Sequence, residues 1–408
     1  MHCRRILYMA GILLILDGLG DREHPKYGER TPLEYANTPN MDELVREGAT
    51  GLFVSIGVGI PPGSAAAMLS ILGYDPVRDN PGRGVLDALG ADVYIPGALA
   101  ARANLATAKD GEIIDRRAGR LSDPVLLEQI ERTLNTIELP EAEARFKITL
   151  HYRGVLVIKP KHFQPSANLL SNDPEAPDFS GTLNVQPKTE DAQRTADLVN
   201  LWLSEARKRL EEIGGPANYV LLRGFGTQVP SVEPFKEKLG ATLAAVSGLT
   251  YLKGIAKMVG GAAIDVPEEN IEENVKGVLR AIKENKERFD LFVTHIKATD
   301  VYGHDGDFEG KARAIEYIDR ELVGPLRDAL DPESDVLAIT GDHSTPVTER
   351  RHTGDPVPLL IWGRGVRKDR SQVFGEHECM YGGLGLLRRD ELVRTVVDLL
   401  GKSRRTGA

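Results

Sequence analysis

The stretch "GILLILDG", residues 11–18, is a run of aliphatic residues that ends abruptly in an acid and a glycine. Near-continuous Ile, Leu and Val without polar alternation is typical of a strand that is covered on both faces. Three later stretches have the same character, and the last of them ends at glycine without an acid: "DLFVTHIKATD" (290–300), "DVLAITGDHS" (335–344) and "PVPLLIWG" (356–363). Together they predict a mostly parallel sheet.

Helical patterns lie between these strands, at roughly 41–48, 268–284 and 310–329. Strands that alternate with helices indicate an α/β fold with helices on both faces of the sheet. In such sheets ligands gather outside the carboxyl ends of the strands. Asp17, Asp300 and Asp342 each follow a predicted strand end, and their like charges would repel unless cations held them together.

The middle of the chain has a different pattern, with short strands separated by helices at about 124–136 and 189–213. It predicts a smaller α+β domain inserted into the first one. The domain boundaries are expected near "LGADVYIPG" and "GTQVPSVEPF". We therefore expect a discontinuous catalytic domain that comprises residues 1–95 and 236–408. The inserted substrate-holding domain would comprise residues 96–235.

Composition limits the class of protein. The 408 residues are 41% hydrophobic and 27% charged, which excludes a disordered or fibrous chain and is more than one compact core usually holds. The formal net charge of -9 argues against a nucleic-acid partner. An acidic substrate would need a local cluster of Arg or Lys, because the field of the whole protein would repel it.

The first 20 residues have a basic start before an apolar run, a pattern that is also typical of a signal peptide. The apolar run, residues 6–16, ends in Asp17 without a small-residue cleavage site, so we interpret it as a buried strand. No stretch reaches the roughly 20 apolar residues of a membrane span. The cysteines, Cys3 and Cys379, do not form a disulfide framework, and a cytoplasmic location is expected.

Carboxylates and imidazoles recur at the predicted strand ends. A single histidine usually only makes hydrogen bonds, but four such locations together predict a site for two metal ions. Oxygen and nitrogen ligands without a thiolate suit Mn²⁺ or Mg²⁺, with Co²⁺ and Zn²⁺ as alternatives. Paired divalent ions assist phosphoryl transfer. The residues concerned are Asp17, Asp300, His304, Asp342, His343 and His352.

Ser64 is the candidate nucleophile. It follows the turn residues Pro61–Gly63 and opens a predicted helix with small residues in its first turn. A serine there would lie at the positive end of the helix dipole, near free backbone N–H groups. The alternative is that Ser64 merely caps the helix.

Basic residues concentrate in the inserted region, above all in "DRRAGR" at 115–120. Arginine forks bind carboxylate and phosphate in a bidentate manner. The alternative for any one of them is a solvated basic surface. The residues predicted to bind substrate are Arg116, Arg117, His151, Arg153, Arg223 and Lys253.

Taken together, these motifs resemble the archaeal-type cofactor-independent (2,3-bisphosphoglycerate-independent) phosphoglycerate mutases of the alkaline-phosphatase superfamily. The motifs are "LDGLGD", "PPGSAAAMLSILGYDP", "GRGVLDALGA", "DRRAGR", "HYRGVLVI", "THIKATDVYGHDGD", "TGDHSTP" and "RHTGDPVPLLIWG". The resemblance implies interconversion of 3-phosphoglycerate and 2-phosphoglycerate through a phosphoserine, in glycolysis and gluconeogenesis. It also implies two divalent ions and no 2,3-bisphosphoglycerate.

The resemblance further implies residue roles. Ser64 would be the nucleophile, and the two metals would be held by Asp17, Ser64, Asp342 and His343, and by Asp300, His304 and His352. Bacterial and plant relatives carry an asparagine-rich loop around the nucleophile, whereas this chain has "PPGSAAA" (61–67). This difference leaves the metal ligands unaffected, because their motifs match those of the family directly.

Other functions stay open on sequence grounds. A metal-dependent phosphohydrolase, or a phosphotransferase acting on another small hydroxy-acid, would use the same Ser64 and metals. A metal- or phosphate-binding protein without catalytic activity is a third possibility. The sequence does not identify the oligomeric state or the general base, for which Asp17 and an acid of the inserted region are both suitable.

Overall fold

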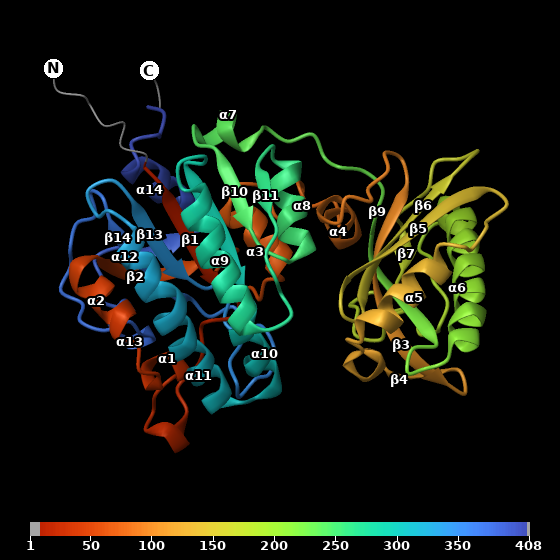
Figure 1. The fold of residues 1–408 in the computed structure, drawn as a ribbon, viewed down its shortest axis with the longest axis horizontal. Helices are drawn as coiled ribbons and strands as arrows, with labels where there is room; N and C mark the ends of the chain where they lie inside the picture. Colours follow the sequence, from red (N-terminus) through yellow and green to blue (C-terminus); the bar gives the residue numbers. More distant parts are fainter. Residues whose placement is uncertain (1–8, 406–408) are drawn as a thin grey trace. The chain divides into compact units, whose positions relative to one another are not determined.

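The computed structural model describes residues 9–405, and the first part of the predicted strand at 6–16, together with Cys3, lies outside them. The chain divides into two compact units (Figure 1). The first comprises residues up to 79, 232–248 and the chain from 259 on; the second comprises 80–231 and 249–258. Residues 80–95 and 249–258 thus pack with the second unit, whereas the sequence-based boundaries assign them to the first.

The first unit contains an eight-stranded sheet. Its central strands β12, β1 and β13 are parallel, and β1 lies between the other two. β14 runs antiparallel to both of its neighbours, so the sheet is mostly parallel, as the sequence predicts. The strands, in spatial order, are β11 (Ala262–Ile264), β10 (Leu243–Val246), β12 (Leu291–Ile296), β1 (Gly11–Leu16), β13 (Val336–Thr340), β14 (Val357–Gly363), β2 (Ala49–Val54) and β15 (Gly385–Arg388).

Helices cover both faces of this sheet. Ile12, Leu14 and Leu16 of β1 belong to a core that includes residues of α2, α9 and α12. On the other face, a Cβ at Gly11 would touch Val396 of α14. The helices of this unit are α1 (Pro32–Tyr35), α2 (Pro39–Glu47), α3 (Ser64–Ile71), α7 (Phe235–Leu239), α9 (Ile271–Asn285), α10 (Ala298–Asp305), α11 (Phe308–Ile318), α12 (Gly324–Ala329), α13 (Glu376–Cys379) and α14 (Glu391–Leu399), with short turns η1 (Pro25–Tyr27) and η4 (Asp319–Val323).

The second unit contains a five-stranded antiparallel sheet. The long amphipathic helix α6 packs its apolar face, including Trp202, into a separate core with residues of β3, β6 and β9. The elements are α4 (Arg83–Gly90), β3 (Leu99–Lys109), β4 (Glu112–Asp115), η2 (Ala118–Arg120), α5 (Pro124–Leu134), β5 (Ala142–Leu150), β6 (Arg153–Pro160), β7 (Leu169–Leu170), β8 (Gln186–Pro187), η3 (Glu190–Ala192), α6 (Gln193–Ile213), β9 (Tyr219–Gly226) and α8 (Thr250–Met258).

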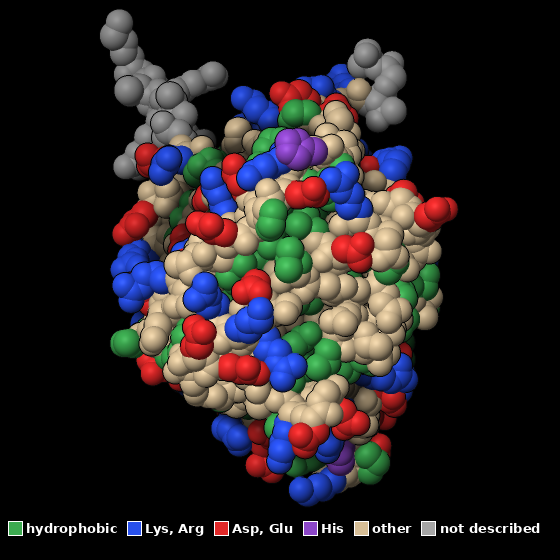
Figure 2. Space-filling model, turned by 90° about the vertical axis from the view of Figure 1, so that its right-hand side faces the viewer, with side chains coloured by type: hydrophobic (Ala, Val, Ile, Leu, Met, Phe, Trp, Pro, Cys, Tyr) green, Lys and Arg blue, Asp and Glu red, His purple; other side chains and the backbone are tan. Residues whose placement is uncertain are grey.

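Surface charge is mixed on the face drawn in Figure 2, where acidic and basic side chains alternate. Ion pairs such as Arg207–Glu211, on the exposed side of α6, are of this kind. Across residues 9–405, none of the helices has both the length and the apolar character needed to cross a bilayer. Cys379 is a free thiol, and burial raises its pKa to about 12, which leaves it unreactive.

Candidate functional site

Three buried carboxylates meet at one edge of the large sheet. Asp17 directly follows β1, Asp342 follows β13, and Asp300 lies in the first turn of α10, just after β12. Because β1 pairs with both β12 and β13, the carboxyl ends of these strands are adjacent. The residues are 0%, 1% and 2% exposed respectively, so their charges need compensation from nearby cations.

Two histidines complete a group around Asp300. Nε2 of His304 and Nε2 of His352 lie 3.4 and 3.3 Å from its Oδ1. Each histidine contacts a backbone carbonyl through its other nitrogen, His304 to Arg350 and His352 to Pro62. A carbonyl only accepts, so each Nδ1 donates to its carbonyl, and each Nε2 faces the Asp300 carboxylate.

The segment around Asp300 lies outside the helices predicted from the sequence, and a glycine lies between Asp300 and His304. The structure has the helix α10 there, so the two side chains meet as an i,i+4 pair on one helix face. Asp307 accepts a hydrogen bond from Gly310 N–H and caps the next helix, α11.

The second group forms around His343. Its Nε2 lies 3.2 Å from Asp17 Oδ1 and 3.4 Å from Asp342 Oδ2. The Thr345 hydroxyl donates to Asp300 and lies 3.1 Å from His343 Nδ1. Since its one proton is used, that hydroxyl accepts from Nδ1–H, and Nε2 is directed at the carboxylates.

These residues fit a pair of divalent cations. Asp17 Oδ1 and His343 Nε2 are buried and have no hydrogen-bond partner. Two acceptors that face each other at 3.2 Å repel unless a proton or a cation lies between them. Ligand atoms within 4.8 Å of one another form the groups Asp300–His304–His352, Asp17–Asp300–His343 and Asp17–His295–Asp342.

Sequence reasoning missed two residues of this site, His295 and Lys297. Nε2 of His295 lies 3.1 Å from Asp342 Oδ2, and the Lys297 ammonium donates to Asp17 Oδ2 and Asp300 Oδ2. Lys297 therefore holds one oxygen of each carboxylate, and the other oxygen of each faces the histidines. A histidine within the otherwise apolar strand "LFVTHI" was the signal that could have identified His295.

Charge compensation shifts the pKa values of this site. Burial would raise the pKa of Asp342 and of Asp300, but His343 and Lys297 respectively hold both well below the ordinary value. Burial would lower the pKa of His343 and of His295, but the carboxylates raise both. The site therefore binds positive charge tightly, as protons or as metal ions.

Ser64 is the first residue of α3 and is partly exposed. The N-cap of this helix is Gly63, so Ser64 does not serve as the cap. The preceding loop approaches the metal residues, because the Pro62 carbonyl accepts from His352 Nδ1–H at 2.7 Å. A contact of Ser64 itself with the metal residues stays a prediction.

The second unit brings two of the predicted substrate-binding arginines together. Arg116 makes a bidentate pair with the buried Asp173, at 2.6 and 2.7 Å, and Arg223 lies 3.3 Å from the same carboxylate. Burial and the charges of Arg83 and Arg223 hold the pKa of Arg102 well below its usual value. Asp173 compensates the charges of Arg116 and Arg223, whereas the positive charge crowded around Arg102 favours binding of an anion there.

The remaining predicted substrate residues lie on a hairpin and a helix. His151 occupies the turn between β5 and β6 with φ at 52°, a strained backbone conformation for a non-glycine residue. Arg153 Nε is buried without a hydrogen-bond partner, which suits a donor awaiting an anion. Arg117 is exposed, and Lys253 lies on α8.

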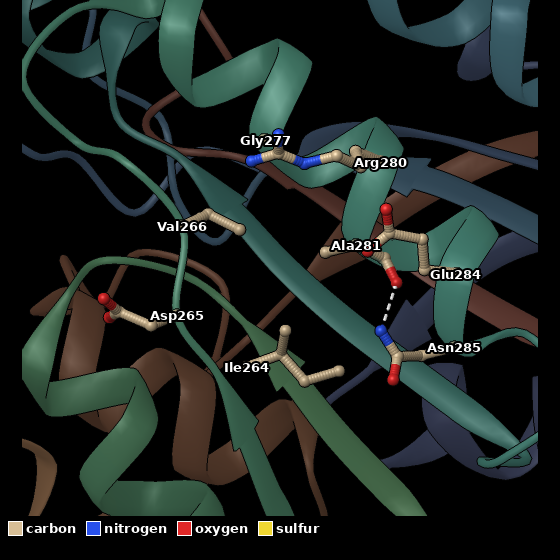
Figure 3. Close-up of a pocket in the computed structure, with 8 residues that line it drawn as sticks. All are labelled: Ile264, Asp265, Val266, Gly277, Arg280, Ala281, Glu284 and Asn285. Carbon is tan, nitrogen blue, oxygen red and sulfur yellow. Dashed lines mark hydrogen bonds between the residues drawn. The ribbon is translucent and has the colours of Figure 1, made fainter.

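A different cavity, of about 350 Å³, lies between β11 and α9 (Figure 3). Arg280 and Glu284 flank it, and Ile264 and Val266 contribute apolar surface. None of the proposed metal ligands is among the residues that line it.

Comparison with known proteins identifies the family. Residues 9–398 match the metalloenzyme superfamily. A 2,3-bisphosphoglycerate-independent phosphoglycerate mutase from Methanopyrus kandleri is 39% identical over 428 residues, covering 99% of this chain and 98% of that protein. The chain belongs to this family of phosphoglycerate mutases.

Solved structures agree with this membership. A protein from Pyrococcus horikoshii is 33% identical with a TM-score of 0.80, and covers 99% of this chain and 100% of its own. The cofactor-independent phosphoglycerate mutase from Thermoplasma acidophilum is 31% identical with a TM-score of 0.64, over 96% of this chain and 100% of its own. The resemblance that the sequence motifs indicated to the phosphoglycerate mutase family is thus confirmed.

Proposed function

We propose that this chain interconverts 3-phosphoglycerate and 2-phosphoglycerate through a phosphoserine on Ser64, in the cytoplasm, as a step of glycolysis and gluconeogenesis. The observation that supports this most directly is the cluster of three buried carboxylates with histidine ring nitrogens directed at them. Relatives that share more than a third of their residues along nearly the whole chain carry the same enzyme name.

We assign the metal ligands as the family resemblance implies. Asp17, Ser64, Asp342 and His343 would hold one divalent ion, with Mn²⁺ or Mg²⁺ as the favoured metals. Asp300, His304 and His352 would hold the other. When bound, such ions neutralise phosphoryl oxygens and lower the pKa of a coordinated hydroxyl.

The residues of the chain then transfer the phosphoryl group twice, from 3-phosphoglycerate to Ser64 and from Ser64 back to glycerate. Ser64 loses its proton and its Oγ attacks phosphorus, while the bond from phosphorus to the glycerate 3-oxygen breaks and that oxygen takes up a proton. The 2-hydroxyl of glycerate next loses its proton and attacks the phosphoserine, which releases Ser64 Oγ. Asp17 or an acidic residue of the inserted region accepts and returns the protons.

Glycerate must stay bound between the two transfers, and this is the role we assign to the domain at 96–235. His151, Arg153, Arg116, Arg117, Arg223 and Lys253 would bind the carboxylate and phosphate of the substrate. Arg153 is the leading choice, because its buried Nε lacks a partner. Exclusion of water is equally necessary, since hydrolysis of the phosphoserine would turn the mutase into a phosphatase.

An assay of product type tests the proposal. The Mn²⁺-loaded protein is supplied with 3-phosphoglycerate and no 2,3-bisphosphoglycerate, while 2-phosphoglycerate and inorganic phosphate are both measured. We expect 2-phosphoglycerate to predominate and Ser64→Ala to form none, although this variant keeps its fold. Predominant phosphate release would favour the phosphohydrolase alternative, and substantial turnover by Ser64→Ala would contradict the phosphoserine route.

A further inference from the structure

Lys311 is a buried lysine with no part in the chemistry described so far. It lies on α11 and is 0% exposed, which is rare for a lysine without a specific partner. Its ammonium lies 2.7 Å from Asp21 Oδ2, 3.2 Å from the Gly20 carbonyl oxygen and 3.0 Å from the Thr345 carbonyl oxygen. An ammonium has three donors, so each of them has one acceptor.

These acceptors belong to two loops that both carry proposed metal ligands. Gly20 and Asp21 follow Asp17 in the loop after β1, and Thr345 follows His343 in the loop after β13. The loops also contact each other directly, because Thr345 N–H donates to the Gly20 carbonyl at 3.0 Å. Asp21 additionally accepts from Val347 N–H, so a single carboxylate and a single ammonium join the two loops.

Thr345 connects this buried pair to the metal site. Its carbonyl accepts from Lys311, while its hydroxyl contacts Asp300 Oδ1 at 2.9 Å and His343 Nδ1 at 3.1 Å. A shift of the Thr345 backbone would therefore misdirect one ligand of each proposed cation. The loops have little room to adjust, because a Cβ at Gly20 would lie 2.0 Å from Ser344 Oγ.

We propose that Lys311 is a positioning residue: with Asp21 it fixes the loops after β1 and β13 and, through Thr345, the orientation of Asp300 and His343 for metal binding. A buried charge pair is costly to form and is weak support for stability, so a geometric role explains its presence better. Partners of metal ligands typically change metal affinity about 10–100-fold when they are altered.

The proposal rests on the proposed two-metal function, and the experiment separates the two. Calorimetric titration of EDTA-treated protein with Mn²⁺ alone gives the dissociation constants of the wild type and of the double variant Lys311→Met/Asp21→Asn. The double variant leaves no single buried charge behind. We expect its dissociation constants to be about 10–100-fold higher than those of the wild type.

Lys286→Met is a control at another buried carboxylate of the same unit. Lys286 pairs with the buried Asp335, which accepts from Ala10 N–H at the opposite ends of β1 and β13. This variant should lower the melting temperature and leave the Mn²⁺ dissociation constants unchanged. If the methionine variant does not fold, Lys311→Gln/Asp21→Asn takes its place, because it keeps hydrogen-bond donors. A rise in its Mn²⁺ dissociation constants is again expected.

Three outcomes are possible. Weaker Mn²⁺ binding by the Lys311 variants but not by Lys286→Met supports the proposal. Binding equal to that of the wild type, with a loss of stability like that of Lys286→Met, would show that Lys311 is only structural and would overturn it. No Mn²⁺ binding by the wild type would instead contradict the two-metal function itself.

Discussion

Replacement of Lys297 by methionine should destabilise the metal-free protein far more than the metal-loaded protein. The Lys297 ammonium donates to both Asp17 Oδ2 and Asp300 Oδ2, and these carboxylates are 0% and 2% exposed. Removal of one partner of a buried ion pair costs about 3–5 kcal/mol. Because the Lys297 side chain is 29% exposed, we take the lower end, about 3 kcal/mol.

This free energy corresponds to a measurable change in melting temperature. In a domain of roughly 150–250 residues, 1 kcal/mol shifts the midpoint by about 2–4 °C, so we expect Lys297→Met to lower it by about 6–12 °C in EDTA. Saturating Mn²⁺ would supply positive charge to the same carboxylates, and the difference from the wild type should shrink. Scanning calorimetry with EDTA and with Mn²⁺ measures both values.

Lys402→Met is the control in the same unit, because Lys402 pairs with Asp290 near the surface, with side chains 35% and 23% exposed. Such a pair contributes at most about 1 kcal/mol, and the loss should be equal with and without Mn²⁺. If metal-free Lys297→Met melts no lower than Lys402→Met, or if Mn²⁺ does not reduce its deficit, Lys297 does not compensate the charge of these carboxylates.

Four other predictions concern binding, metal dependence, pH and the second unit. Arg153→Met should raise KM for 3-phosphoglycerate about 10–100-fold, which corresponds to the free energy of one charge-assisted hydrogen bond. Hydrolysis of p-nitrophenyl phosphate should stay unchanged, and equal losses in both assays would argue against a glycerate-binding role. Exhaustive chelation should abolish turnover and Mn²⁺ or Co²⁺ should restore it, whereas full activity of a protein shown to be metal-free would reject the metal assignment. The raised pKa values of His295 and His343 contribute stability that is complete below about pH 6.5 and is lost as pH rises through the higher folded-state values. The melting temperature of the metal-free protein should therefore fall as the pH rises above about 6.5, and a melting temperature that stays constant would contradict this. Trp202→Ala should lower the free energy of unfolding by about 3–5 kcal/mol, because the side chain is fully buried. Trp202→Phe should lower it much less, because Trp202 Nε1 has no hydrogen-bond partner to lose. Equal losses for the two variants in urea unfolding would contradict this.

The strand pattern and the ligands at strand ends were predictable because both are local. A run such as residues 11–16 must be buried on both faces. In a parallel sheet the carboxyl ends of all strands lie at the same edge, so the residues that follow them lie there too. Asp17, Asp300 and Asp342 could therefore be placed together without knowledge of any contact. The antiparallel direction of β14 depends on its pairing with β13 and β2, which its apolar residues do not encode.

Residues that act through the backbone or from inside an element could not be predicted in this way. Thr345 and Lys311 become relevant only through hydrogen bonds that join distant segments, and neither has a distinctive sequence neighbourhood. The helix α10 was missed because glycine disfavours a helix locally, whereas the fold places Gly303 where a Cβ would lie 2.4 Å from the Thr345 carbonyl oxygen. Close packing, and not helix propensity, accounts for that glycine.

Charge balance explains why the proposed site needs two cations. Three carboxylates and the Lys297 ammonium have a combined formal charge of minus two. One divalent ion would only neutralise them, and a neutral site in a protein of net charge -9 would not attract a phosphorylated acid. Two divalent ions would make the site positive by two charges, which a phosphoryl dianion then cancels. Lys297 thus neutralises one of the three carboxylate charges. The carboxylates then cancel the charge of one divalent ion only, and the charge of the second ion remains to attract the phosphoryl group.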